Sequence, residues 1–68
     1  MNGDSQLNDL YRKYNQKPSL NEFREFCTTL IRESRGSREK KAEFVRTLAG
    51  AQSMNRMLTS TQNYFLAG

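Results

Sequence analysis

Basic side chains concentrate in the middle of this 68-residue chain, and they are its main candidates for chemistry. Six of the eleven Lys and Arg residues fall between positions 32 and 46, where small residues interrupt them. Guanidinium and ammonium groups bind phosphates, and the free amides of a helix N-terminus favour the same ligand. We therefore predict a surface that contacts the phosphates of DNA or RNA, formed by Arg32, Arg35, Ser37, Arg38, Lys40, Lys41 and Arg46.

The same segment has a simpler interpretation as an ordinary solvated helix surface. Glu33, Glu39 and Glu43 offset about half of the local positive charge. Arg32 and Arg35 also stand where any helix favours cations, close to its negative C-terminal end. The net charge of +4 and the pI of about 9.6 agree with either interpretation.

A second candidate surface is the C-terminal segment, which has no charged side chain from Met57 to Gly68. Uncharged, aromatic and Met-bearing surfaces are typical of protein interfaces. The alternative function is thus a protein-binding regulator or inhibitor, such as a virus or mobile element could encode, or the contact of a homodimer. The residues for this role are Met54, Met57, Leu58, Tyr64 and Phe65, although a last core helix would show the same pattern.

The composition of the chain offers little for catalysis. The chain has no His, the most common general base, and its single Cys27 lies on the apolar face of a predicted helix. Zinc sites need several Cys or His ligands, and the carboxylates of Glu39 and Glu43 stand among lysines. The four glycines occur singly, so no glycine-rich phosphate loop is present. We expect a non-enzymatic protein without a metal or cofactor.

The sequence predicts helices along the whole chain, and these helices must position the candidate residues. Leu7, Leu10 and Tyr14 recur at helical spacing, with Ser5 as the expected N-cap and Pro18 beyond the helix end. Ser19 and Glu22 form the pattern of a capping box for a second helix over about 20–34. Its core stripe consists of Leu20, Phe23, Phe26, Cys27, Leu30 and Ile31, and Arg32 and Arg35 fall in its last turn.

Two further helices are expected after Gly36, a residue that can close the second helix with a left-handed angle. One runs over about 38–49 with Ser37 as its cap and Phe44, Val45 and Leu48 inside, and Ser53 caps the other. Gly50 marks the break between them, although a glycine inside one fused helix costs only about 1 kcal/mol relative to Ala. Gly50 does not fit the turn of a helix-turn-helix, because Arg46 occupies a position that needs a small residue.

The predicted fold is therefore all-α, a compact bundle of three or four short helices in a single domain over residues 1–68. With 35% apolar residues and no disulfide, such a bundle has a small core and a marginal stability. We therefore expect a homodimer, which would add buried surface. The lone thiol and the polar N-terminus favour the cytoplasm. The apolar run from Tyr64 to Ala67 is far shorter than the roughly 20 residues of a membrane span.

Overall fold

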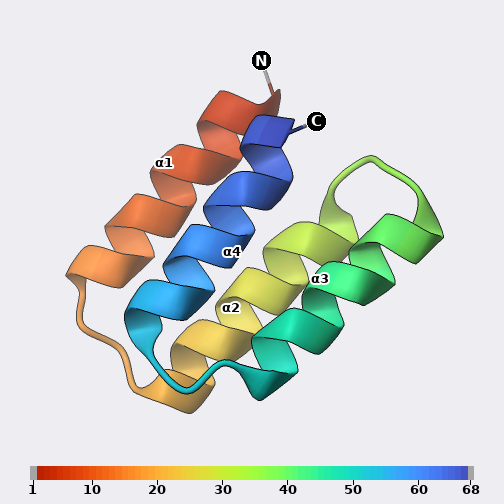
Figure 1. Ribbon diagram of the computed structural model, residues 1–68. Helices are drawn as coiled ribbons and strands as arrows, with labels where there is room; N and C mark the ends of the chain where they lie inside the picture. Colours follow the sequence, from red (N-terminus) through yellow and green to blue (C-terminus); the bar gives the residue numbers. More distant parts are fainter. Residues whose placement is uncertain (1, 68) are drawn as a thin grey trace.

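The protein folds into four α-helices, as the sequence predicts (Figure 1). The computed structural model describes residues 2–67, and the surroundings of side chains from residue 5 onward. The helices follow an up-down-up-down path, and connections of three or four residues keep consecutive helices antiparallel. Their bounds are Asn2–Asn15 for α1, Leu20–Glu33 for α2, Arg38–Gly50 for α3 and Met54–Ala67 for α4.

Two of the helices form the centre of the bundle. Within the described residues, α2 and α4 pack against each other and against both remaining helices, whereas α1 and α3 do not touch. Figure 1 shows α1 and α3 at opposite sides with α2 and α4 between them. The molecule measures 29 × 25 × 16 Å. The junction of α2 with α3 therefore lies at one edge of the bundle, away from α1.

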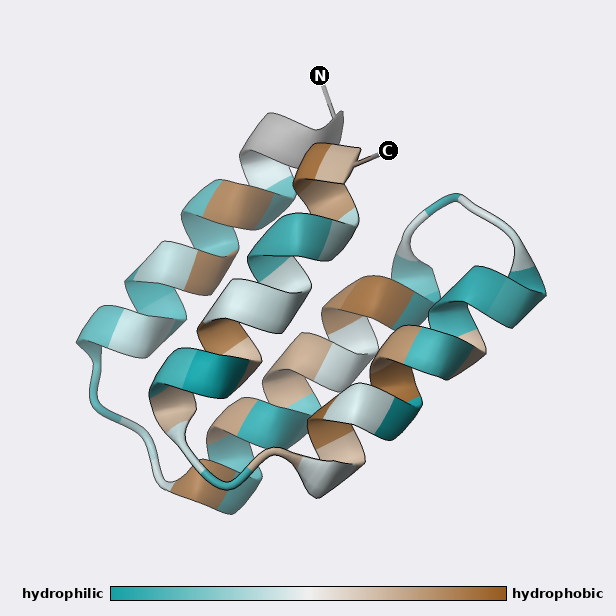
Figure 2. Cartoon of the chain, viewed as in Figure 1, coloured by the Kyte–Doolittle hydropathy of each residue, from teal (hydrophilic) through white to brown (hydrophobic). Residues whose placement is uncertain are grey.

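Every helix turns an apolar stripe inward, and brown and teal residues alternate along each ribbon in Figure 2. The core residues are Leu10, Phe23, Cys27, Ile31, Leu48, Ala51, Met57 and Tyr64. Leu20 departs from the predicted stripe, because as the first residue of α2 it lies at the end of the bundle and stays 42% exposed. None of the four described helices is long and apolar enough to cross a bilayer.

The predicted capping signals are confirmed at three helix starts. The Ser19 hydroxyl accepts a hydrogen bond from the Glu22 amide at 3.1 Å, and the Glu22 carboxylate accepts one from the Ser19 amide at 3.4 Å. The side chains of Ser37 and Ser53 accept bonds from the amides of the third residues after them, at 3.1 and 3.2 Å. Each cap satisfies an amide that a helix start leaves without a partner.

Glu22 also connects α2 to α1. The Lys13 ammonium lies 3.3 Å from its carboxylate, and this hydrogen bond, together with the Ser19 amide and the lysine charge, lowers the pKa of Glu22. Both partners of the pair meet solvent, so its contribution to stability is small.

The start of α1 and the end of α2 differ from the prediction. α1 begins at Asn2, so Ser5 lies inside the helix and is not its N-cap. No proline precedes Ser5, and Gly3 is tolerated within a helix. α2 ends at Glu33 with Ser34 as its C-cap, which places Arg35 in the turn and not in the last helical turn. The break at Gly50 is confirmed, since α3 ends there and Ala51 takes an extended conformation.

Arg24 of α2 binds the end of α3 and the residue that follows it, and no local sequence pattern predicts this contact. Its Nε donates to the Leu48 carbonyl at 3.1 Å and its Nη2 to the Ala51 carbonyl at 2.7 Å. Its Nη1 donates to the Asn21 side chain at 2.8 Å, which fixes the guanidinium plane. The Leu48 carbonyl also accepts the Ala51 amide at 3.1 Å, so the half-buried arginine adds a second donor there and satisfies the Ala51 carbonyl. Its charge complements the negative end of α3.

We expect Arg24→Met to lower the free energy of unfolding by about 1.5–3 kcal/mol, because hydrogen bonds to charged groups contribute about this much and the Ala51 carbonyl loses its donor. Arg12→Met is the matched control, since Arg12 is exposed on α1 and should change stability by less than about 0.5 kcal/mol. Urea unfolding followed by circular dichroism measures both. Equal stability of the two variants would show that Arg24 does not hold α3.

Candidate nucleic-acid interface

A hollow of about 390 Å³ opens between the end of α2 and the outer side of α3. We call it the basic groove, and the residues that line it are Arg32, Arg38, Lys41, Ala42, Val45 and Arg46. Four of these six residues are cations, the other two are aliphatic, and no carboxylate lines the groove. On α3 the lining positions recur at spacings of three and four, which places them on one helix face.

Lys41 joins the two walls of the groove. Its ammonium donates a hydrogen bond to the Arg32 backbone carbonyl at 3.2 Å, at the C-terminal end of α2. The contact satisfies a carbonyl that the helix leaves free and sets a positive charge against the negative end of the helix dipole. An ammonium has three N–H donors, so Lys41 keeps two for a ligand.

The cations of the groove form no close ion pair with the neighbouring glutamates among the described side chains. Among the side chains of residues 5–67, the ion pair within 4.0 Å is that of Lys13 with Glu22, which lies on the α1 side of α2. Glu33, Glu39 and Glu43 thus make no close pair with the cations of the groove.

Three predicted residues lie outside the lining of the groove. The Ser37 hydroxyl accepts a bond from the Lys40 amide at 3.1 Å and caps α3. The Lys40 ammonium lies over the Tyr64 ring, 5.7 Å from its centre. Arg35 is exposed in the turn between α2 and α3. Of the seven residues predicted for phosphate contact, the structure gathers four, and the others border them.

The turn that brings α2 and α3 together is held by the hydroxyl of Tyr64, a residue of α4. This oxygen lies 2.8 Å from the Ser34 hydroxyl and 3.2 Å from the Arg35 carbonyl, to which it can donate. The Ser34 hydroxyl also reaches the Ile31 carbonyl at 2.6 Å. The two hydroxyl groups have two protons for these three short contacts, so the contacts share donors within one small network at the end of α2.

Gly36 is required beside this network. Its φ of +138° is an angle that side-chain-bearing residues rarely adopt, and a Cβ there would lie 2.9 Å from the Tyr64 hydroxyl. The Tyr64 ring is itself fixed by edge-on contacts with Phe44 and Phe65, each with centres 5.1 Å apart. Packing of α4 thus determines where the turn, and with it the basic groove, can lie.

Two of the five residues predicted for a partner or dimer interface on α4 belong to the core, whereas Leu66 of the same helix is 65% exposed. Met57 and Tyr64 are buried in the core, with exposures of 0% and 4%, so their side chains cannot reach a partner in this fold. Met54, Leu58 and Phe65 are partly buried and pack against the same core. α4 is therefore a core helix first, because a bundle of this size needs its apolar stripe inside.

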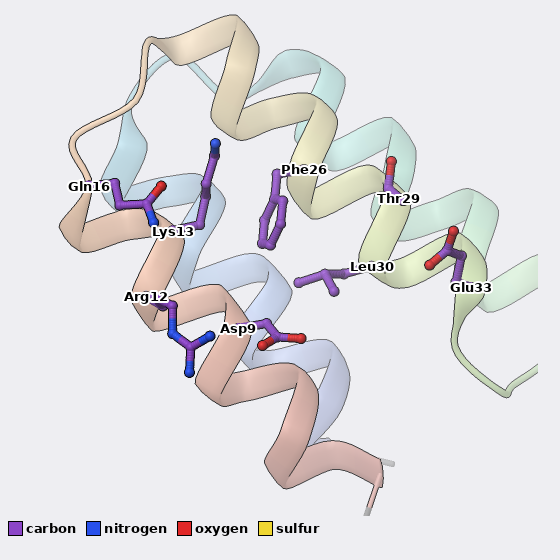
Figure 3. A pocket seen from close by; sticks show the side chains of 8 residues that line it. All are labelled: Asp9, Arg12, Lys13, Gln16, Phe26, Thr29, Leu30 and Glu33. Carbon is purple, nitrogen blue, oxygen red and sulfur yellow. The ribbon is translucent and has the colours of Figure 1, made fainter.

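A second hollow, of about 480 Å³, lies between α1 and α2 (Figure 3). The Phe26 and Leu30 side chains point into it from α2. Its rim carries both signs of charge, since Asp9 and Glu33 accompany Arg12 and Lys13. A polyanion meets no consistent charge there, so this hollow lacks the property that distinguishes the basic groove.

The candidates for chemistry of other kinds lie inside the protein. Cys27 is buried, and burial raises the pKa of its thiol to about 11, which the neighbouring Thr61 hydroxyl opposes only in part. Thr61 Oγ1 is itself buried without a well-formed hydrogen bond among the described residues. Within the described chain, no three His, Cys, Asp or Glu side chains are placed to hold a metal ion.

Comparisons with protein-family models, with curated proteins and with solved structures give no match. The basic groove is therefore judged by its own geometry and charge.

We expect Tyr64→Phe to cost about 1–2 kcal/mol of folding free energy, because it leaves the Arg35 carbonyl without its donor. Gly36→Ala should cost more than about 1 kcal/mol, from its backbone angle and its contact with the hydroxyl. The two changes should not be additive, since removing the hydroxyl removes the clash. Urea unfolding of both single variants and the double variant measures this coupling, and additive values would contradict the contact.

We expect Cys27 to resist thiol reagents at pH 8 in the folded protein and to react quickly in urea. Because its pKa is raised in the folded state to about 11, from an ordinary 9.0, folding favours the protonated thiol. This contribution is complete below the ordinary pKa and is lost as the pH rises through about 11. Urea unfolding at several pH values should thus show a smaller alkaline loss for Cys27→Ala than for wild type, and equal losses would contradict burial of the thiol.

Proposed function

We propose that this chain is a small, non-enzymatic regulatory protein that binds nucleic-acid phosphates through the basic groove. The observation that carries the proposal is the gathering of four cations from two helices around one hollow that no carboxylate lines. Arginine offers several N–H donors in a plane that matches phosphate oxygens, and lysine adds a mobile point charge. The groove thus has the donors and the charge that a phosphate chain requires.

The energetics of such a contact are mainly electrostatic. Each phosphate that a cation neutralises releases condensed counterions, so the affinity falls steeply as salt rises. Arg32, Arg38 and Arg46 are exposed and can adjust to the ligand. The Ala42 and Val45 side chains form the aliphatic remainder of the lining, which offers no hydrogen bond to a base.

A helix-turn-helix mode of binding receives no support. α3 and α4 run antiparallel (Figure 1) and pack against each other, whereas the two helices of that motif meet at a steep angle. The cations of the groove instead come from α2 and α3. Contacts to backbone phosphates are therefore favoured over a recognition helix that reads base edges.

One chain is sufficient for the proposed site, because all six lining residues belong to it. The homodimer and the cytoplasmic location stay predictions from the sequence. A protein partner at α4 also stays a prediction, and Met57 and Tyr64 are buried in this fold.

The double substitution Arg38→Ala with Arg46→Ala tests the proposal, since both side chains are exposed and line the groove. We expect about a tenfold loss of affinity for each arginine, the effect of about 1.4 kcal/mol per charged contact. The matched control is Arg12→Ala with Arg56→Ala, which removes the same charge from α1 and α4. Fluorescence anisotropy with a labelled DNA duplex at low salt measures the dissociation constants.

The control double variant should bind within about threefold of wild type, because removing distant charge weakens only the general attraction. Thermal unfolding should show that both double variants stay folded. Absence of wild-type binding, or equal losses in the two double variants, would contradict the proposal.

A further inference from the structure

The aromatic residues of this protein all lie away from the basic groove. The chain has three Tyr and four Phe residues, and none of them is among the groove-lining residues. Phe44, Tyr64 and Phe65 pack together between α3 and α4. Tyr14 packs on Phe23 with ring centres 5.7 Å apart.

The two remaining rings are on the α1 side of the molecule. Tyr11 accepts a hydrogen bond from the Gln62 side chain at 2.7 Å, across the contact of α1 with α4. Phe26 points into the hollow between α1 and α2 (Figure 3). Proteins that bind single strands combine a positive groove with aromatic rings on which bases stack. The basic groove has the charge without the aromatic rings.

The backbone of α3 fixes the positions from which three of the groove cations extend. From Arg38 to Arg46 the axis of α3 advances about 12 Å, at about 1.5 Å per residue. Lys41 is held to the end of α2 by its bond of 3.2 Å to the Arg32 carbonyl, so the two walls keep their spacing. This rise of about 12 Å is similar to the width of the major groove of B-DNA, which is about 12 Å. A duplex presents its phosphates in rigid rows on the two sides of that groove. A flexible single strand must instead lose backbone entropy to present its phosphates at this spacing.

We propose that the basic groove binds the phosphate rows of a double-stranded nucleic acid and does not read its sequence. This inference rests on the proposed function and names its substrate class. Phosphate contacts position a protein on a duplex without carrying sequence information. The groove offers donors for phosphates, aliphatic surface at Ala42 and Val45, and no side-chain amide for a base edge.

The salt dependence has an expected size. Four cations that each neutralise one phosphate give a slope of log K against log salt of about −3.6 on B-DNA, at about −0.9 per contact. Loss of Arg38 and Arg46 should reduce this slope to about −1.8. The control double variant of Arg12 and Arg56 should keep the wild-type slope.

The experiment compares a DNA duplex of about 12 base pairs with its separated strands, with a duplex of scrambled sequence and with an RNA duplex of equal length. Such a duplex is roughly 40 Å long at about 3.4 Å per base pair. It therefore exceeds the longest dimension of the protein, which is 29 Å. Fluorescence anisotropy with wild-type protein gives each dissociation constant at several salt concentrations.

We expect the two DNA duplexes to bind within about twofold of each other and the single strands at least about tenfold more weakly, a difference of about 1.4 kcal/mol. DNA and RNA duplexes both present rows of phosphates, and the ratio of their dissociation constants shows which duplex the groove prefers.

Equal or tighter binding of single strands would overturn the inference, and so would a strong preference between the two DNA sequences. In either case the proposed function would stand as long as the Arg38 and Arg46 double variant still lost affinity. If neither duplex nor single strand bound, or if the double variant bound like its control, the proposed function would fail as well.

Discussion

The hydroxyl of Tyr64 is the contact on which the proposed site depends. It reaches from α4 to Ser34 and to the Arg35 carbonyl at 2.8 and 3.2 Å, and so it fixes the turn that sets α3 beside the end of α2. Without this oxygen the turn would lose its hydrogen bonds to α4. The Tyr64 hydroxyl would then no longer exclude a Cβ at position 36. A core residue of the last helix thus shapes a surface groove to which it does not itself belong.

Two cations hold the α2–α3 pair at its opposite ends, each by binding carbonyls at the C-terminus of the other helix. Arg24 of α2 binds the Leu48 and Ala51 carbonyls, and Lys41 of α3 binds the Arg32 carbonyl. In both contacts a positive charge meets the negative end of a helix dipole. Because Lys41 uses one donor in this way and the three arginines of the groove make no close ion pair among the described side chains, the groove keeps most of its positive charge for a ligand.

Local features of the fold could be predicted from the sequence, and contacts between distant residues could not. The capping box at Ser19, the caps at Ser37 and Ser53 and the end of α3 at Gly50 depend on neighbouring residues, and all are confirmed. The predicted start of α1 at Ser5 was wrong, because a serine followed by an apolar stripe does not by itself begin a helix. Contacts such as Arg24 with Ala51 and Ser34 with Tyr64 span 27 and 30 residues and leave no periodic signal. For the same reason the sequence located the basic segment but could not separate the groove-lining cations from Lys40, which covers a ring.

If phosphates bind between α2 and α3, titration with a DNA duplex should change the backbone amide chemical shifts of that region. We expect the largest shifts at Arg32 and along 38–46, with small shifts on α1 and on the outer side of α4. Shifts centred on the hollow between α1 and α2, or spread evenly over all four helices, would contradict binding at this site.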